Sequence, residues 1–199
     1  MTVGILGGAF DPPHAGHVVL AREAIAQFGL ERLVALVVEE PAHKPVETPV
    51  EWRVELARAA FADVPEVEVV SDDHAYTVDF LRAGDLPEDA VFVVGADELA
   101  DFLAWREPDE ILRRVLLGVA TRPGYSSGEL DDVLARLERP ERVELFEIPA
   151  IETSSTEVRR RVEAGLPIDD LVPPGVARLV VARGLYHGRV DPPGRAKLR

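Results

Sequence analysis

The sequence predicts an α/β fold, a Rossmann-like doubly wound parallel sheet of about six strands with a small C-terminal helical segment. Short apolar runs alternate along the chain with longer segments in which apolar residues recur at helical spacing. The most apolar run is Ala90–Val94, as expected for a strand that is covered on both faces. Polar or glycine-rich loops follow several runs, at the sheet edge where open parallel sheets bind ligands.

The apolar runs define the predicted strands in chain order. They are Val3–Leu6, Arg32–Val38, Val67–Val70, Ala90–Val94, Val115–Ala120 and Val143–Ile148. The second run is almost entirely aliphatic or β-branched, which favours a strand buried on both faces. In the last run apolar and polar residues alternate, which is typical of a strand with one covered face.

Segments with helical spacing lie between these strands and after the last of them. They are Val18–Phe28, Glu51–Ala62, Asp73–Leu81, Leu99–Trp105, Asp109–Arg114, Leu130–Leu137, a helix that opens after Thr153, and Val176–Ala182. In the first helix Val18, Ala24 and Phe28 are spaced to form an apolar face, and Gly29 suits the residue after its end. The order strand, helix, strand is complete by Val38 and predicts parallel pairing.

The stretch Gly7–His17, GGAFDPPHAGH, joins the first strand to the first helix. Its paired glycines let a ligand approach the backbone, and the helix start offers unpaired N–H groups and a positive dipole end. His14 and His17 project toward the same anion if the helix has begun by residue 14 or 15. The stretch predicts a phosphate site; the alternative is a tight turn with two uninvolved histidines.

A second hydroxyl-rich helix start lies at Thr153–Thr156. Its hydroxyls and N–H groups suit a phosphate, and Arg159 follows Thr156 by three residues on the same side of the helix. The alternative is a plain capping sequence followed by a basic, exposed face. Its pairing with the first glycine-rich stretch favours the phosphate interpretation.

Four further positions follow predicted strands or lie in the loops after them. Gly95 would let a ligand approach, and Asp97 would accept hydrogen bonds from ribose hydroxyls, unless Asp97 only caps a helix. Lys44 is placed for a second anion, the alternative being a solvated loop lysine. Trp105 is either a core residue or, as its polar neighbours favour, partly exposed and able to stack on a ligand.

Composition restricts the class of protein. The 199 residues carry a formal net charge of −14, which argues against broad contact with nucleic acid. There is no cysteine and no apolar run of membrane-spanning length, so we expect a cytoplasmic protein without disulfides or membrane contact. Residues 1–186 are predicted to form a single domain, with a helical part from about residue 153, and residues 187–199 a disordered tail.

Motifs from Gly7 to Tyr186 resemble those of the bacterial nicotinate-nucleotide adenylyltransferase family, within the HxGH nucleotidyltransferase superfamily. Besides GGAFDPPHAGH, the matching motifs are PAHKP, AYTVDFL, FVVGADEL with the following Trp105, TRPGY, SSTEVR and LVPPGVARLVVARGLY. The resemblance implies a transferase that condenses ATP with nicotinate mononucleotide into deamido-NAD and pyrophosphate. It also implies Mg²⁺ that arrives with ATP, and no metal held by the protein alone.

The resemblance assigns expected roles on the ATP side. His14, His17 and Arg159 would be the catalytic contacts to phosphates, and the helix end at Ser155 and Thr156 would hold the β and γ groups. The remaining residues implied at ATP are Gly7, Gly8, Ala9 and Phe10 beside the phosphates, Gly95 and Asp97 at the ribose, and Arg122 near adenine.

The acceptor side is implied in the same way. Lys44 would meet the phosphate of nicotinate mononucleotide, the backbone of Tyr76 and Thr77 its ring carboxylate, and Trp105 would stack on its ring. This chain departs from the family pattern at two positions. It has Ala9 where the family often has a residue with a hydroxyl group, and Thr153 where the family usually has an apolar residue.

Alternatives stay open at this point. Transfer to nicotinamide mononucleotide or to phosphopantetheine uses the same first motif, although a phosphopantetheine enzyme lacks the YT, GAD and Trp combination present here. A nucleotide-binding regulator without catalysis belongs to a different class, against which the retained histidines argue. The sequence does not determine whether the chain forms a homo-oligomer.

Overall fold

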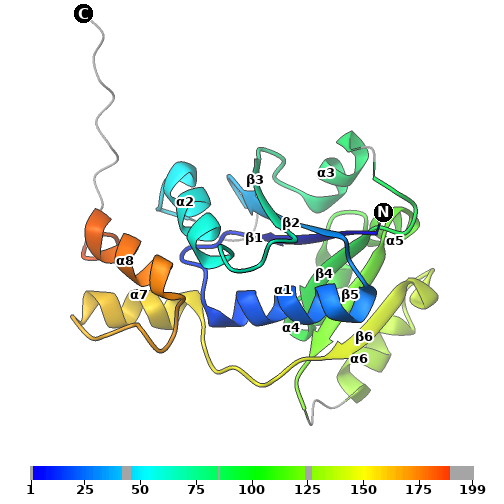
Figure 1. Cartoon of the computed structure of the whole chain (residues 1–199). Helices are drawn as coiled ribbons and strands as arrows, with labels where there is room; N and C mark the ends of the chain where they lie inside the picture. The colour runs from blue at the N-terminus through cyan, green and yellow to red at the C-terminus, as the bar shows by residue number, and fades with distance from the viewer. Residues whose placement is uncertain (1, 42–45, 85, 124–126, 189–199) are drawn as a thin grey trace, which may run out of the picture.

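A single parallel sheet organises the computed structural model, which describes residues 2–41, 46–84, 86–123 and 127–188 (Figure 1). The strands are β1 Val3–Gly8, β2 Arg32–Val38, β3 Val67–Asp72, β4 Val91–Gly95, β5 Leu116–Thr121 and β6 Val143–Glu147. Their spatial order is β3-β2-β1-β4-β5-β6, and all pairs are parallel. This is the order of a doubly wound Rossmann-like sheet, so the predicted fold class is confirmed.

Helices connect the strands and close the described part of the chain. They are α1 Ala15–Phe28, α2 Val50–Ala60, α3 Thr77–Ala83, α4 Ala96–Ala100, α5 Pro108–Arg114, α6 Ser127–Leu134, α7 Ser155–Glu163 and α8 Pro174–Arg183, with the 3-10 turns η1 Phe102–Ala104 and η2 Pro140–Arg142. Figure 1 shows α7 and α8 together at the end of the molecule where α1 begins.

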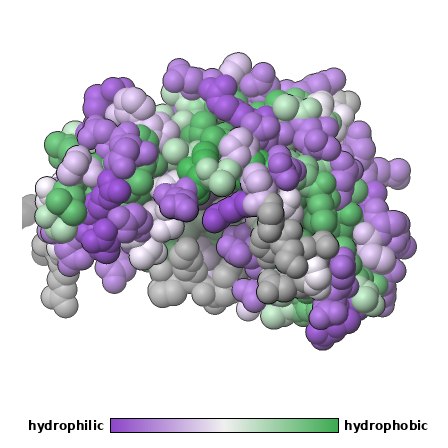
Figure 2. Space-filling model, turned by 90° about the horizontal axis from the view of Figure 1, so that it is seen from below, coloured by the Kyte–Doolittle hydropathy of each residue, from purple (hydrophilic) through white to green (hydrophobic). Residues whose placement is uncertain are grey.

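Two cores lie on opposite faces of the sheet. In β2, Leu33 and Val37 join the core under α1, α2, α7 and α8, whereas Val34 and Leu36 join the core under α3, α4, α5 and α6. Successive side chains of a strand point to opposite faces, so an unbroken apolar run serves both layers. Hydrophilic residues cover most of the face seen in Figure 2, in keeping with the acidic composition.

Two predicted helical segments have different bounds in the structure. The segment 73–81 becomes helical only at Thr77, because β3 continues to Asp72 and Tyr76 is still extended (φ −127°, ψ 136°). The segment 99–105 is not one helix: α4 ends at Ala100 and η1 follows it. Gly95, not Asp97, is the N-cap of α4, so the alternative role for Asp97 is wrong.

Several expectations fall outside what the structure describes. Lys44 and residues 189–199 of the predicted tail lie outside the described residues. Among the described helices, none has both the length and the apolar character needed to cross a membrane. The extent of the domain stays a prediction.

Candidate active site

A cleft of about 1680 Å³ opens at the carboxyl ends of β1 and β4. These two strands are neighbours, yet the chain proceeds from β1 toward β2 on one side and from β4 toward β5 on the other. Loops at such a switch point diverge and leave a crevice, which is where open α/β sheets bind ligands. The cleft is bordered by the segments that follow the six strands and by the start of α7.

Close packing against two aromatic rings favours the paired glycines at the end of β1. A Cβ atom on Gly7 would lie 3.3 Å from the ring of Phe92, and one on Gly8 would lie 3.3 Å from the ring of Phe10. Phe10 itself has a left-handed φ of 49°, which is uncommon for a residue other than glycine, and its ring is buried. The loop therefore places the backbone of Gly7, Gly8 and Ala9 along the cleft.

The two histidines lie together at the start of α1. His14 is the N-cap residue, and its backbone N–H donates to Nδ1 of His17 over 3.1 Å. Their ring centroids are 3.9 Å apart, and Phe10 packs against His17 at 5.1 Å. Because Nδ1 of His17 accepts this bond, the neutral ring carries its proton on Nε2. The two rings thus lie together and both residues line the cleft, while their contact with an anion stays a prediction.

Helix α7 docks its first turn onto the loop that carries these histidines. Ser154 caps α7 by accepting from the N–H of Glu157, and the Ser155 hydroxyl donates to the carbonyl of Pro12 over 2.8 Å. Arg159 donates to the carbonyl of Asp11. These contacts span more than 140 residues of sequence and bring Ser155 and Arg159 to the cleft with His14 and His17.

Thr156 has a different place from its predicted neighbours. It is not among the residues that border the cleft, and its hydroxyl accepts a hydrogen bond from Arg159 over 3.3 Å. The described geometry thus has Thr156 holding Arg159, while Ser155 and Arg159 face the cleft.

Arg53 of α2 is a supporting residue that the sequence analysis missed. Its side chain is only 1% exposed, and its guanidinium donates to the carbonyls of Ala9, Val38, Glu39 and Thr48. Burial lowers the pKa of Arg53, while nearby acidic groups, Asp11 first, oppose the shift. An arginine stays charged at any ordinary pH, so it ties the ends of β1 and β2 together with a buried positive charge.

A signal for Arg53 is present in the sequence. Counting along α2, Arg53 stands three residues before Leu56, four before Ala57 and seven before Ala60, which places it on the buried face of the helix. A charged residue at such a position requires several hydrogen-bond acceptors.

Asp11 and Tyr186 form a second supporting contact. The Asp11 side chain is 9% exposed, and its Oδ1 accepts from the Tyr186 hydroxyl over 2.8 Å. Burial raises the pKa of Tyr186, and the Asp11 carboxylate raises it further, so the phenol stays protonated and donates. The contact fastens the segment after α8 to the histidine loop, 175 residues earlier in the chain.

Removing the hydroxyl in Tyr186→Phe is expected to lower the free energy of unfolding by about 1–3 kcal/mol, because it leaves a buried carboxylate short of a donor. Urea denaturation of both proteins measures the difference. The exposed His187→Phe variant next to it is the matched control, for which we expect a change within about 0.5 kcal/mol. Equal midpoints for Tyr186→Phe and wild type would contradict a contribution from this bond.

The far side of the cleft carries the predicted ring-binding residues. Tyr76 is the N-cap of α3 and Thr77 its first residue, so backbone N–H groups of α3 lie at this edge. Trp105 packs edge-on against Phe92 at 6.3 Å, and the guanidinium of Arg106 lies 4.9 Å from the centre of the Tyr76 ring. Trp105 is half-buried and borders the cleft, as its polar neighbours indicated.

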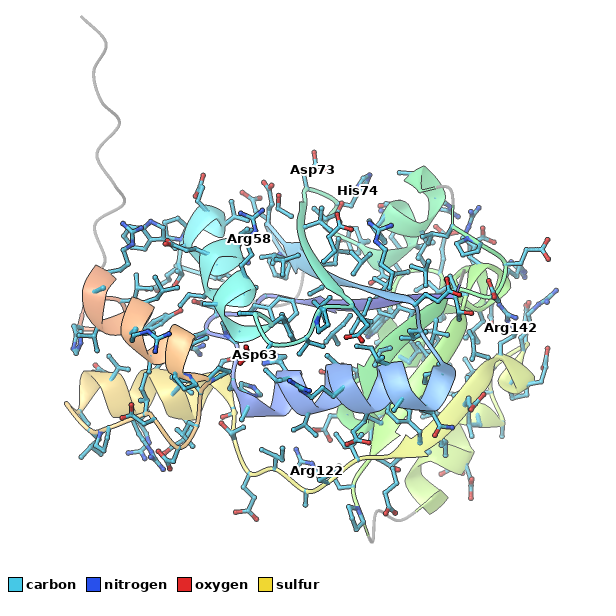
Figure 3. All side chains as sticks on the ribbon, viewed as in Figure 1. Arg58, Asp63, Asp73, His74, Arg122 and Arg142 are labelled. Carbon is cyan, nitrogen blue, oxygen red and sulfur yellow. The ribbon has the colours of Figure 1, made fainter. Side chains whose placement is uncertain are left out.

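Between the two halves lie the ends of β4 and β5. The Gly95 N–H donates to the Glu98 carboxylate over 3.1 Å, and a Cβ atom on Gly95 would meet that carboxylate at 2.8 Å. Asp97 and Arg122 are both exposed and both border the cleft; Arg122 follows β5 (Figure 3). The predicted ribose and adenine contacts thus reach the same cleft as the histidines.

His74 is a cleft residue that the sequence analysis did not select. Its Nδ1 lies 2.7 Å from Oδ1 of Asp72, which is a hydrogen-bond distance. Two ligand atoms of one Mg²⁺ ion with bonds of about 2.1 Å in octahedral geometry lie farther apart than this, so the contact is a His–carboxylate hydrogen bond rather than half of a magnesium site.

The phosphate half offers imidazole, guanidinium and backbone N–H groups, which suit phosphate oxygens.

Comparisons with known proteins identify the family of this chain. The family model described as cytidylyltransferase-like matches residues 5–161. A protein of Rubrobacter xylanophilus is 38% identical over 94% of this chain and 92% of its own length, and one of Saccharopolyspora erythraea is 40% identical over 96% and 92%. Both carry the name "Probable nicotinate-nucleotide adenylyltransferase".

A solved structure supports the fold independently of close sequence similarity. The nicotinic acid mononucleotide adenylyltransferase of Plasmodium falciparum, complexed with NaAD, superposes with a TM-score of 0.76 at 16% identity, over 96% of this chain and 99% of that one. With the relatives above at 38% and 40% identity over nearly the whole chain, the conclusion is direct: the chain belongs to the nicotinate-nucleotide adenylyltransferase family of cytidylyltransferase-like proteins.

Proposed function

We propose that this chain transfers the adenylyl group of ATP to nicotinate mononucleotide, giving deamido-NAD and pyrophosphate. The observation that carries the proposal is that two groups of residues border the same switch-point cleft. One group is His14, His17 and Arg159, and the other is Tyr76 and Trp105. A cationic end suits a triphosphate, and an aromatic end with helix N–H groups suits a ring acid. The names of the relatives support this acceptor.

The reaction needs positioning more than acid–base chemistry. A 5′-phosphate oxygen of the mononucleotide, already ionised at neutral pH, attacks the α-phosphorus of ATP; a new P–O bond forms, and the bond to the β-phosphate bridging oxygen breaks. The electron pair leaves with pyrophosphate. His14, His17 and Arg159 stabilise that growing charge, and no covalent enzyme intermediate is needed.

The remaining residues are assigned to binding. Gly7, Gly8, Ala9 and Phe10 present backbone to the phosphates, Gly95 and Asp97 hold the ribose, and Arg122 lies near adenine. Ser155 at the start of α7 supports the β and γ groups, and Thr156 acts indirectly, through the hydrogen bond that it accepts from Arg159. On the acceptor, Thr77 and Tyr76 meet the ring carboxylate, Trp105 stacks, and Lys44 meets the phosphate. Mg²⁺ enters as MgATP, because the phosphates are its preferred hard ligands.

Phosphorus NMR of the purified chain with MgATP and nicotinate mononucleotide tests which bond is broken. We expect the ATP signals to be replaced by those of a dinucleotide and of inorganic pyrophosphate in equal amounts. Formation of ADP would contradict attack at the α-phosphorus. ATP binding without any turnover would favour the alternative of a non-catalytic regulator. Turnover only with phosphopantetheine would show that this compound, and not nicotinate mononucleotide, is the acceptor.

A further inference from the structure

His74 borders the cleft in the segment between β3 and α3, close in sequence to the residues proposed to bind the acceptor (Figure 3). It stands two residues before Tyr76, the N-cap of α3, and its side chain is 35% exposed. Asp72, at the end of β3 and 9% exposed, holds it through the 2.7 Å contact between Oδ1 and Nδ1. With Nδ1 fixed by Asp72, the imidazole has a defined orientation at the cleft edge.

Acidic groups surround this edge. Asp73 lies 3.6 Å from His74 and is exposed, and Asp79 faces it from the first turn of α3. On the β2 side, the N–H of Glu39 donates to the carbonyl of Asp72, which also brings a carboxylate-bearing residue next to β3. A mononucleotide with an ionised phosphate and a ring carboxylate is repelled by such a rim unless cations offset it.

Few cations are available there among the described residues. Arg106 and Arg82 both pair with Asp79, at 2.9 Å and 3.7 Å, and Arg82 also pairs with Glu107. His74 is the nearest described titratable cation to the aspartates of the β3 end. The hydrogen bond to Asp72 raises the pKa of His74 above its usual value, with the charges of Asp72, Asp73 and Asp79 acting in the same direction.

We propose that His74, oriented by Asp72, is a specificity-determining residue that in its protonated form favours an acceptor with a ring carboxylate over one with a ring carboxamide. The inference rests on the proposed function and deepens it. The substrates compared, nicotinate and nicotinamide mononucleotide, differ only in that ring group, so their shared phosphate cancels from the ratio of their kcat/KM values. That ratio isolates the charge beside the ring.

The sign of the pH dependence follows from the raised pKa. His74 is fully charged below its ordinary pKa of about 6.5, and the charge is lost as pH rises through the higher value in the folded protein. We therefore expect the preference for nicotinate mononucleotide to fall about fivefold between about pH 6 and pH 9, the size of one partly exposed charge pair.

Three variants make the test specific. In His74→Gln we expect a ratio that is low and independent of pH. In Asp72→Asn the decrease of the ratio with rising pH should occur at a lower pH than in wild type, because the neutral amide no longer stabilises the charged imidazolium. Asp73→Asn is the matched control: this carboxylate is 86% exposed and farther away, so its curve should stay close to wild type.

Each outcome has a distinct meaning. A His74→Gln enzyme that adenylylates both mononucleotides with the wild-type ratio and pH dependence overturns the inference alone. An Asp73→Asn shift as large as that of Asp72→Asn overturns the assigned partner. Absence of turnover with either mononucleotide in the wild-type protein overturns the proposed function, and the inference with it.

Discussion

Replacing His17 by alanine is expected to lower kcat about 10²- to 10³-fold, the largest effect on activity that we predict. The centres of its ring and of the His14 ring are 3.9 Å apart, and its Nδ1 accepts a hydrogen bond from the His14 N–H, so the ring has a fixed place beside the cleft, where it meets ATP in the proposed reaction. Its contact strengthens as charge moves onto pyrophosphate, so kcat falls along with kcat/KM. Steady-state kinetics with MgATP and nicotinate mononucleotide measure both parameters.

The control for His17 is another histidine on the same chain. His187 is exposed and is not among the residues that border the cleft, so His187→Ala should retain wild-type kcat. Thermal unfolding of both variants separates lost catalysis from lost folding. A His17→Ala enzyme with unchanged kcat and an intact fold would contradict a catalytic role for His17.

The largest effect on stability is expected for Arg53→Leu, which should lower the free energy of unfolding by about 3–5 kcal/mol. The substitution removes the donors for four main-chain carbonyls, three just at or after the ends of β1 and β2 and one, that of Thr48, just before α2. Leucine replaces only part of the buried volume, and the carbonyls keep their desolvation cost. Urea denaturation, followed by circular dichroism, gives the difference.

Arg58 supplies the matched control because it lies on the same helix and is exposed (Figure 3). Arg58→Leu should change the free energy of unfolding by no more than about 0.5 kcal/mol. Arg53→Lys should fall between the two, since an ammonium keeps the charge and reaches fewer carbonyls. Arg53→Leu and Arg58→Leu proteins of equal stability would contradict a structural role for the buried guanidinium.

Local sequence signals predicted the strands well because their cause is local. The run that became β4 is apolar on both faces, and both faces are in fact covered by helices. Helix starts were harder to predict. α3 begins at Thr77 rather than near Asp73, since β3 pairing with β2 extends as far as Asp72, and pairing partners are not visible in a local pattern.

The candidate site shows the same division. The histidines, Arg159 and the glycines were found because they belong to compact motifs. Arg53 was missed although its position on the apolar face of α2 was visible, because its carbonyl partners come from three separate segments that only the fold brings together. Tyr186 was missed because its contact with Asp11 spans 175 residues. His74 was missed for a different reason. Its hydrogen bond to Asp72 becomes apparent only when the structure shows that β3 ends at Asp72, beside the cleft.

A competition between acceptors tests the central claim most directly, namely that one cleft unites ATP with nicotinate mononucleotide. Equal concentrations of nicotinate and nicotinamide mononucleotide are mixed with limiting MgATP, and the dinucleotides are separated by chromatography. We predict deamido-NAD as the main product, matched one to one by pyrophosphate. A main product carrying the carboxamide, or pyrophosphate without a dinucleotide, would contradict the account.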